Sequence, residues 1–112
     1  MSRISTHILN TSTGKPAAGV NISLSYFKDG SWIDSGEDIT DKDGRISSLL
    51  NENALIEKGV YKIKFMTGNY FKNNGFKFFY PYVEIIFEVD SDEHYHIPLL
   101  ISPFGYTTYR GS

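Results

Sequence analysis

The sequence contains no cysteine, which excludes a disulfide framework and a thiolate metal site. It has no apolar run long enough to cross a bilayer as a helix, and the first stretch, MSRISTHILN, lacks the apolar segment of a signal peptide. Basic runs are also missing, and 11 basic residues are balanced by 13 acidic ones, which disfavours nucleic acid and membrane surfaces as partners. These absences predict a cytoplasmic protein.

Repeats, linkers and low-complexity tracts are missing too. The 112 residues suffice for one domain with a hydrophobic core of its own. We therefore expect residues 1–112 to form a single domain.

Apolar and polar residues alternate in several stretches, which is the pattern of half-buried β-strands. The alternating stretches are VNISLSY (20–26), YKIKF (61–65), VEIIFEV (83–89) and HYHIPLLI (94–101). Glycine, proline and aspartate mark turns between them, at 13–16, 28–31, 42–44 and 102–103. Many short strands separated by close turns predict an all-β sandwich or barrel.

Helix signals are few. The stretch Thr67–Asn73 predicts one short helix that ends near Gly75, and residues 51–58 are long enough for a turn or two. Neither segment is long enough to fill a core.

Three histidines are the most reactive side chains in the sequence: His7, His94 and His96. On a strand, His94 and His96 share a face because successive side chains alternate. A His-x-His pair with a third histidine is one way to hold zinc with an open water position. The pattern therefore leaves two alternatives, a zinc hydrolase and ordinary surface histidines.

Two other stretches carry no site by themselves. The acidic loop 38–44 fails as an EF-hand, because Ile39 and Leu50 stand where that loop needs oxygen ligands. Its Asp43-Gly44 pair instead predicts a tight hairpin turn that delivers Arg45 to the next segment. The aromatic stretches 69–71 and 76–82 favour packing in the core or an interface over a sugar-binding platform.

Five segments together resemble the 5-hydroxyisourate hydrolases of the transthyretin-like family. They are STHILNTSTGKPAAGV, TDKDGR, GVYKIKFMTGNYF, FYPYVEIIFEV and HYHIPLLISPFGYTTYRGS, in the order in which that family has them. The terminal Tyr-Arg-Gly-Ser is the most specific element, since it separates the hydrolases from the hormone carrier transthyretin.

The resemblance implies an all-β, transthyretin-like sandwich of two four-stranded sheets with one short helix. It further implies a homotetramer built as a dimer of dimers, with the active sites in a central channel. The implied reaction is hydrolysis of 5-hydroxyisourate, the product of urate oxidation, to 2-oxo-4-hydroxy-4-carboxy-5-ureidoimidazoline. This reaction needs neither a metal nor another cofactor.

The resemblance also implies the residues of the site. The catalytic residues would be His7, Arg45, His96 and Ser112, while Tyr109, Arg110 and Gly111 would join them in binding substrate. His94 is not one of the family's catalytic positions. Asn10 would cap a loop.

The two histidines would share activation and positioning of a water molecule as base and orienting partner, in an order that the sequence leaves open. The guanidinium of Arg45 would stabilise negative charge, and Gly111, with no Cβ, would permit a close backbone approach. The competing functions are a transthyretin-like carrier without turnover and the zinc hydrolase. On the hydrolase interpretation, a tag fused after Ser112 would impair the enzyme.

Overall fold

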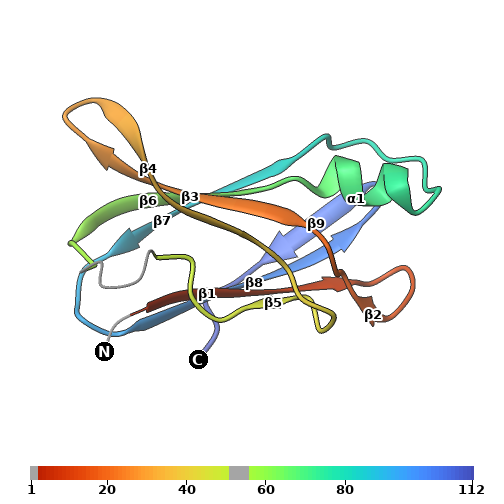
Figure 1. Cartoon of the computed structure of the whole chain (residues 1–112), viewed down its shortest axis with the longest axis horizontal. Coiled ribbons are helices and arrows are strands. Elements are labelled where there is room, and N and C mark those ends of the chain that lie inside the picture. The colour runs from red at the N-terminus through yellow and green to blue at the C-terminus, as the bar shows by residue number, and fades with distance from the viewer. Residues whose placement is uncertain (1–2, 51–55) are drawn as a thin grey trace.

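Two β-sheets stack face to face, and one short helix lies at an end of the stack (Figure 1). The structure, a computed structural model, describes residues 3–50 and 56–112. One sheet has the strand order β2-β1-β8-β9, with β5 also paired to β1, and the other has the order β4-β3-β6-β7. The elements are β1 (Arg3–Asn10), β2 (Lys15–Pro16), β3 (Asn21–Lys28), β4 (Ser31–Ile39), β5 (Arg45–Ile46), β6 (Gly59–Phe65), α1 (Thr67–Asn73), β7 (Val83–Val89), β8 (His94–Ser102) and β9 (Gly105–Thr108).

The predicted all-β sandwich with one short helix is confirmed, with one refinement. The first sheet gains a fifth strand because the two-residue strands β2 and β5 both pair with β1. Strands this short leave no alternation to read in a sequence. Within the stretch 51–58, residues 56–58 form no helix, and residues 51–55 lie outside the described part of the chain.

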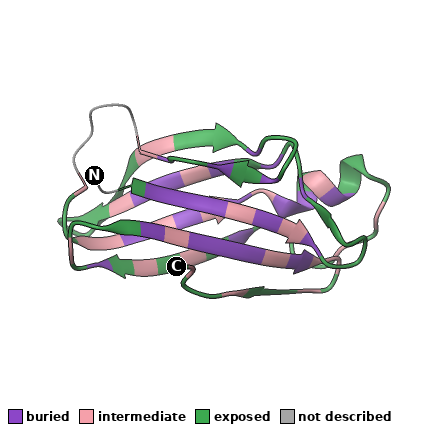
Figure 2. Ribbon diagram, turned by 90° about the horizontal axis from the view of Figure 1, so that it is seen from below, coloured by how far each residue is buried: buried purple, intermediate pink, exposed green. Residues whose placement is uncertain are grey.

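The core lies between the two sheets, and Figure 2 shows burial alternating along their strands. In β1 and β8 most inward residues are aliphatic, as Ile4, Ile8, Leu99 and Ile101 illustrate, each at most 1% exposed. Because side chains two apart share a face, the residues between them point to the outer face of the same sheet.

The outer face of this sheet brings the two ends of the sequence together. Strands β1 and β8 run parallel, in a register that pairs Arg3 with His94 and Ser5 with His96. His7 follows two residues later on β1 and pairs with Arg45 across the antiparallel β1–β5 contact. Backbone pairing therefore collects polar side chains from both ends of the sequence on one surface.

The Asp43-Gly44 turn differs from its prediction. It is no hairpin, since β4 before it and β5 after it belong to different sheets. The Asp41 carboxylate accepts hydrogen bonds from the backbone N–H groups of Asp43 and Arg45, at 2.9 and 3.0 Å. Gly44 has φ +73° and passes so close to β1 that a Cβ would lie 2.5 Å from the carbonyl oxygen of Ile8. The turn thus pins Arg45 beside β1.

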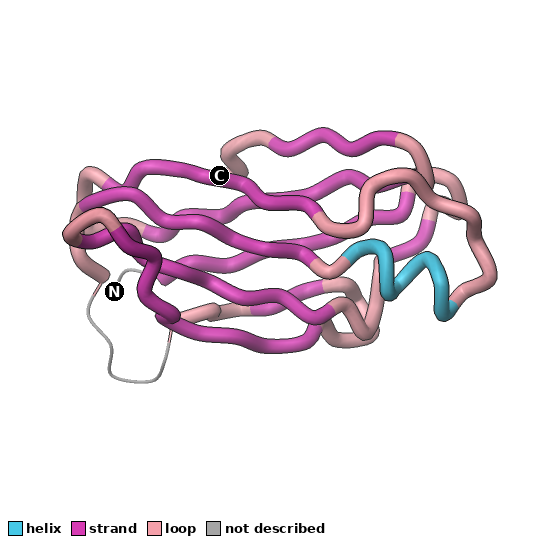
Figure 3. The backbone as a smooth tube through the Cα atoms, turned by 90° about the horizontal axis from the view of Figure 1, so that it is seen from above, coloured by secondary structure: helices cyan, strands magenta, loops and turns pink. Residues whose placement is uncertain are grey.

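The helix occupies the predicted residues and closes the end of the sandwich (Figure 3). Its Phe71 is buried and packs against the rings of Phe76 and Phe78, so core packing explains this part of the aromatic stretch. The side-chain oxygen of Asn10 accepts a hydrogen bond from the Ser12 backbone at 3.0 Å, which confirms its role as a loop cap. No helix in the described ranges is long and apolar enough to cross a membrane.

Candidate active site

An open hollow of about 340 Å³ lies on the outer face where β1, β5 and β8 meet. Three of the residues predicted for the site line it: Arg45, His96 and Ser112. The remaining lining residues are Arg3, Ser5, Thr6, Asp41, Ile46, Ser47 and His94. The hollow therefore combines a guanidinium, imidazoles and hydroxyl groups in one place.

His96 is half-buried where it lines the hollow, and its pKa is lowered. Burial is the largest cause, because a charged imidazole loses solvation there. The nearby positive or protonatable groups of His94, His7, Arg45 and Arg3 add to the shift. At neutral pH His96 is therefore uncharged, the form that can accept a proton.

His7 lies beside the hollow and is not among its lining residues. Its pKa is lowered by burial and by the charge of Arg45, against weaker raising effects from a hydrogen bond to the Asp43 backbone and from the Asp41 and Asp43 carboxylates. The structure thus places His7 against Arg45, at the rim of the site.

Gly111 lies beside His96, and Ser112 after it lines the hollow. The Gly111 N–H donates a hydrogen bond to the His96 carbonyl oxygen at 2.8 Å, which makes a single β-bridge. A Cβ on Gly111 would lie only 2.5 Å from Cδ2 of the His96 ring. Only glycine fits here without displacing the imidazole, and the bridge sets Ser112 at the hollow.

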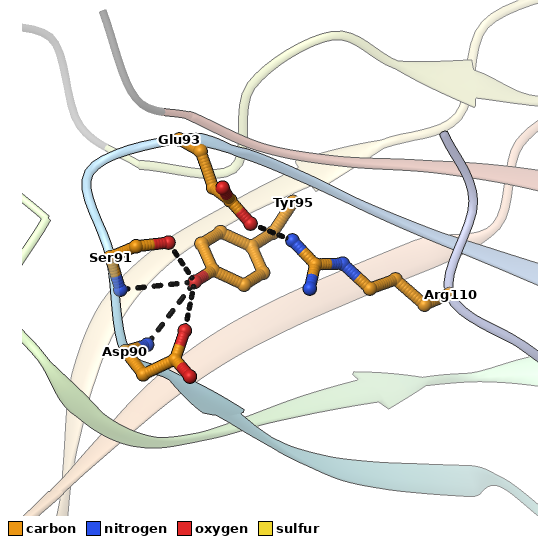
Figure 4. A network of polar contacts seen from close by, with 5 residues as sticks. All are labelled: Asp90, Ser91, Glu93, Tyr95 and Arg110. Carbon is orange, nitrogen blue, oxygen red and sulfur yellow. Dashed lines mark hydrogen bonds and ion pairs between the residues drawn. The ribbon is translucent and has the colours of Figure 1, made fainter.

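Tyr109 and Arg110 lie apart from that hollow. They line a second hollow of about 240 Å³ near β7 and β8, to which His96 also contributes. The Arg110 guanidinium lies 4.6 Å above the Tyr95 ring and pairs with the Glu93 carboxylate, which raises its pKa (Figure 4). The four predicted terminal residues therefore have two different surroundings within one chain. Gly111 and Ser112 lie at His96 and the first hollow, whereas Tyr109 and Arg110 line the second hollow.

Sequence reasoning missed several polar residues that line the hollow, and two of them, Ser5 and Asp41, contact predicted site residues. The Ser5 hydroxyl lies 2.6 Å from Nε2 of His94 and 2.7 Å from Nδ1 of His96. Asp41 holds the turn before Arg45, as described above. The one available signal for Ser5 is its position two residues before His7, on the same face of a strand.

The zinc alternative lacks its ligand set. Among residues 3–50 and 56–112, no three histidine, aspartate or glutamate side chains come close enough together to hold a metal ion. His94 and His96 instead direct one ring nitrogen each toward the Ser5 hydroxyl. The three-histidine site suggested by the sequence is therefore not formed.

The stacked sheets and the polar hollow on one outer face define a transthyretin-like β-sandwich protein. Residues 4–111 match the HIUase/Transthyretin family, and the chain belongs to this family.

The chain is similar to 5-hydroxyisourate hydrolases and to a transthyretin in complex with thyroxine. The 5-hydroxyisourate hydrolase of Salmonella dublin is 44% identical over 110 residues, which cover 97% of this chain and 80% of the relative. The structure of Klebsiella pneumoniae 5-hydroxyisourate hydrolase matches with a TM-score of 0.84 and 38% identity, over 100% of this chain and 94% of that one. Sea bream transthyretin in complex with thyroxine matches with a TM-score of 0.90 and 33% identity, over 97% of this chain and 94% of that one. The family recognised from the five segments is thus confirmed.

Proposed function

We propose that the chain hydrolyses 5-hydroxyisourate, the product of urate oxidation, as an enzyme of purine catabolism. The observation that carries this proposal is the near full-length similarity to 5-hydroxyisourate hydrolases, at 44% identity over 97% of the chain for the Salmonella relative. The site supports it, since Arg45, His96 and Ser112 surround one hollow.

The reaction sets three chemical demands. Water adds its oxygen to a ring carbonyl carbon, so a base must take the water's proton. The carbonyl oxygen becomes negative and needs a positive partner. The C–N bond of the six-membered ring then breaks, and the leaving nitrogen must receive a proton. No step needs a metal or another cofactor.

The proposed roles follow from charge and position. His7 and His96 have lowered pKa values and are neutral at pH 7, so either can take the proton of water while the other orients it. The protonated base can then supply the leaving nitrogen. Arg45 stabilises the oxyanion, because its guanidinium stays charged and presents a planar pair of donors.

The terminal residues bind and enclose the substrate in this proposal. Ser112 contributes its hydroxyl at the hollow, and Gly111 lets the backbone lie against the His96 ring. Arg110 fixes the path of the terminal segment through Glu93 and Tyr95. Tyr109 is 57% exposed in one chain, which leaves its ring free to contact substrate.

We further propose that the chain works as a tetramer, a dimer of dimers with the hollows facing a central channel. The hollow is open in one chain, and a second copy would exclude the water that weakens its electrostatic interactions. Analytical ultracentrifugation checks this: a sedimentation mass near four times 12.7 kDa supports the proposal, whereas an active monomer contradicts it. The cytoplasmic location expected from the sequence remains a prediction.

The activity test generates the substrate in place. Urate and urate oxidase produce 5-hydroxyisourate, whose decay is followed by its ultraviolet absorbance with and without the purified chain. Decay faster than the spontaneous rate supports the proposal, and an unchanged rate contradicts it. Dialysis against a strong chelator should leave the rate unchanged.

The second candidate function is a carrier, which the similarity to sea bream transthyretin favours. It predicts ligand binding without turnover in the same assay. The lining of the hollow argues against it, since a pair of imidazoles and a guanidinium suit a polar, reacting substrate better than an apolar ligand.

A further inference from the structure

Ser5 joins two histidines through a single hydroxyl group. The register of β1 and β8 places Ser5 opposite His96. His94 precedes His96 by two residues on β8 and lies on the same face of the sheet. The Ser5 oxygen lies 2.7 Å from Nδ1 of His96 and 2.6 Å from Nε2 of His94. Ser5 itself is only 5% exposed, so water competes little for these bonds.

The number of protons limits how this bridge can form. A serine hydroxyl has one hydrogen, so it donates to one imidazole and accepts from the other. If Ser5 donates to His94, the Nδ1–H of His96 donates to Ser5, and Nε2 of His96 keeps its lone pair. If Ser5 instead donates to His96, then Nε2 of His96 carries the hydrogen and cannot accept a proton. The two histidines are therefore coupled through Ser5.

We propose that Ser5 and His94 are positioning residues that hold His96 in the Nδ1–H form, so that Nε2 of His96 acts as the base toward water. This proposal rests on the proposed hydrolase function and goes beyond it by choosing between His7 and His96. In this arrangement His94 accepts from Ser5 at Nε2 and carries its own hydrogen on Nδ1. When Nε2 of His96 takes the proton of water, the Nδ1–H bond to Ser5 remains and orients the imidazolium.

The charges around the bridge favour the form that the proposal requires. The titratable and charged groups that face His96 are His94 from β8, Arg3 and His7 from β1, Arg45 from β5 and Asp41 from the turn before β5. Burial and the guanidinium of Arg3 lower the pKa of His94, so His94 is neutral and able to accept at pH 7. Protonated His94 would donate to Ser5 and reverse the bridge.

The first test reads the proton positions without substrate. The chain has only three histidines, so long-range ¹H–¹⁵N spectra of the imidazoles are simple to assign. We expect the Nδ1–H form of His96 at pH 7.5 in the wild type. Ser5→Ala and His94→Ala should shift His96 toward the Nε2–H form, which isolated imidazoles of histidine prefer. A wild-type His96 in the Nε2–H form overturns the proposal whatever the activity.

The second test measures turnover of 5-hydroxyisourate. Ser5→Ala and His94→Ala should each lower kcat about tenfold or more with little change in KM, since a misplaced base affects the proton-transfer step. His94→Gln keeps an acceptor near the position of Nε2 and should restore most of the rate. Ser25→Ala is the matched control, a strand serine that is 9% exposed in the other sheet, and it should change neither kcat nor the spectra.

The outcomes separate this proposal from the proposed function. If both alanine variants keep the wild-type spectrum and kcat, the bridge only packs and the proposal fails while the hydrolase function stands. If the wild type has no activity, the hydrolase function fails, and the spectra still decide whether Ser5 and His94 set the form of His96. Circular dichroism excludes misfolding of the variants as the cause of either loss.

Discussion

Three features of the structure act on the His96 ring: a hydrogen bond, a close backbone contact and a lowered pKa. This combination distinguishes His96 from the other two histidines. Ser5 contacts Nδ1, Gly111 lies against Cδ2, and neighbouring charges with burial lower the pKa. Each constraint comes from a different segment of the chain. Small changes at any of them are therefore expected to alter the chemistry of this one imidazole.

Removing the side chain of His7 or of His96 should abolish most turnover. We expect His96→Ala to lower kcat by about 10²- to 10⁴-fold, the usual contribution of a general base. His7→Ala removes the group that orients the water and should lower kcat about a hundredfold. Steady-state kinetics with substrate generated in place measure the loss. Sedimentation should show the wild-type assembly, and a variant that dissociates would indicate a structural role instead.

Activity should decline in acid. Because the pKa of His96 is lowered from 6.5 by burial and by nearby charges, we expect the acid limb of kcat/KM to have its midpoint below pH 6.5. Above that limb the imidazole is neutral and can accept a proton. A pH–rate profile at constant ionic strength checks this, and a flat profile down to pH 5 would exclude a histidine base.

The contact between Gly111 and His96 makes a small substitution informative. In Gly111→Ala the new Cβ would lie 2.5 Å from Cδ2 of His96, so the ring or the terminal segment must move. We expect kcat to fall about a hundredfold, as for an ångström-scale misplacement, with an unchanged unfolding transition. Gly105→Ala is the matched control, since its Cβ would meet only the Ser102 hydroxyl, at 3.7 Å. Equal activity of the two variants would contradict the role of this contact.

At the scale of elements, strand alternation predicted β3, β6, β7 and β8, and the Thr67–Asn73 prediction matched α1. The sequence failed where structure depends on partners. Strands β2 and β5 exist because β1 offers them a free edge, and the Asp43-Gly44 turn connects different sheets. The alternation of apolar and polar residues indicates which face of a strand is buried. It carries no information on which other strand pairs with it.

The same reason explains what could be predicted of the candidate site. Reactive residue types and the family resemblance point to His7, Arg45 and His96, and these lie at or beside one hollow. The contact between Ser5 and His96 follows only from the register of β1 and β8, since the two residues are 91 positions apart in the sequence. In the same way, the position of Arg110 beside Glu93 and Tyr95, away from the first hollow, depends on the path of the chain after β9, which the sequence pattern does not indicate.

Deleting the segment after β9 removes no strand, and it removes one backbone bridge, the one between Gly111 and His96. Strand β9 ends at Thr108, so deletion of residues 109–112 should preserve the fold and lower kcat/KM about a hundredfold or more. Circular dichroism and turnover measure the two effects. Glu93→Gln is the graded comparison: it removes only the carboxylate partner of Arg110 while the backbone bridge from Gly111 to His96 remains, so we expect a smaller loss than for the deletion. A deletion variant with undiminished activity would contradict the proposed role of the segment.

For the whole molecule, the histidines link folding to pH. All three have pKa values below 6.5 in the folded chain, so the unfolded chain binds protons first as the pH falls. The free energy of unfolding should therefore be unaffected by them above pH 7 and should decrease from pH 6.5 downward. Thermal unfolding between pH 8 and 5 checks this. His96→Asn should show a weaker decrease, and an equal one would assign the effect to other groups.

The parallel pairing of β1 with β8 also has a consequence for folding during synthesis. Until the ribosome has released β8, the nascent β1 has only the two-residue strands β2 and β5 as partners in its sheet. Contacts between such distant segments form late and slowly. Chains that stop before residue 94 expose an unpaired strand edge and are expected to aggregate, which makes translational completion a condition of solubility as well as of catalysis.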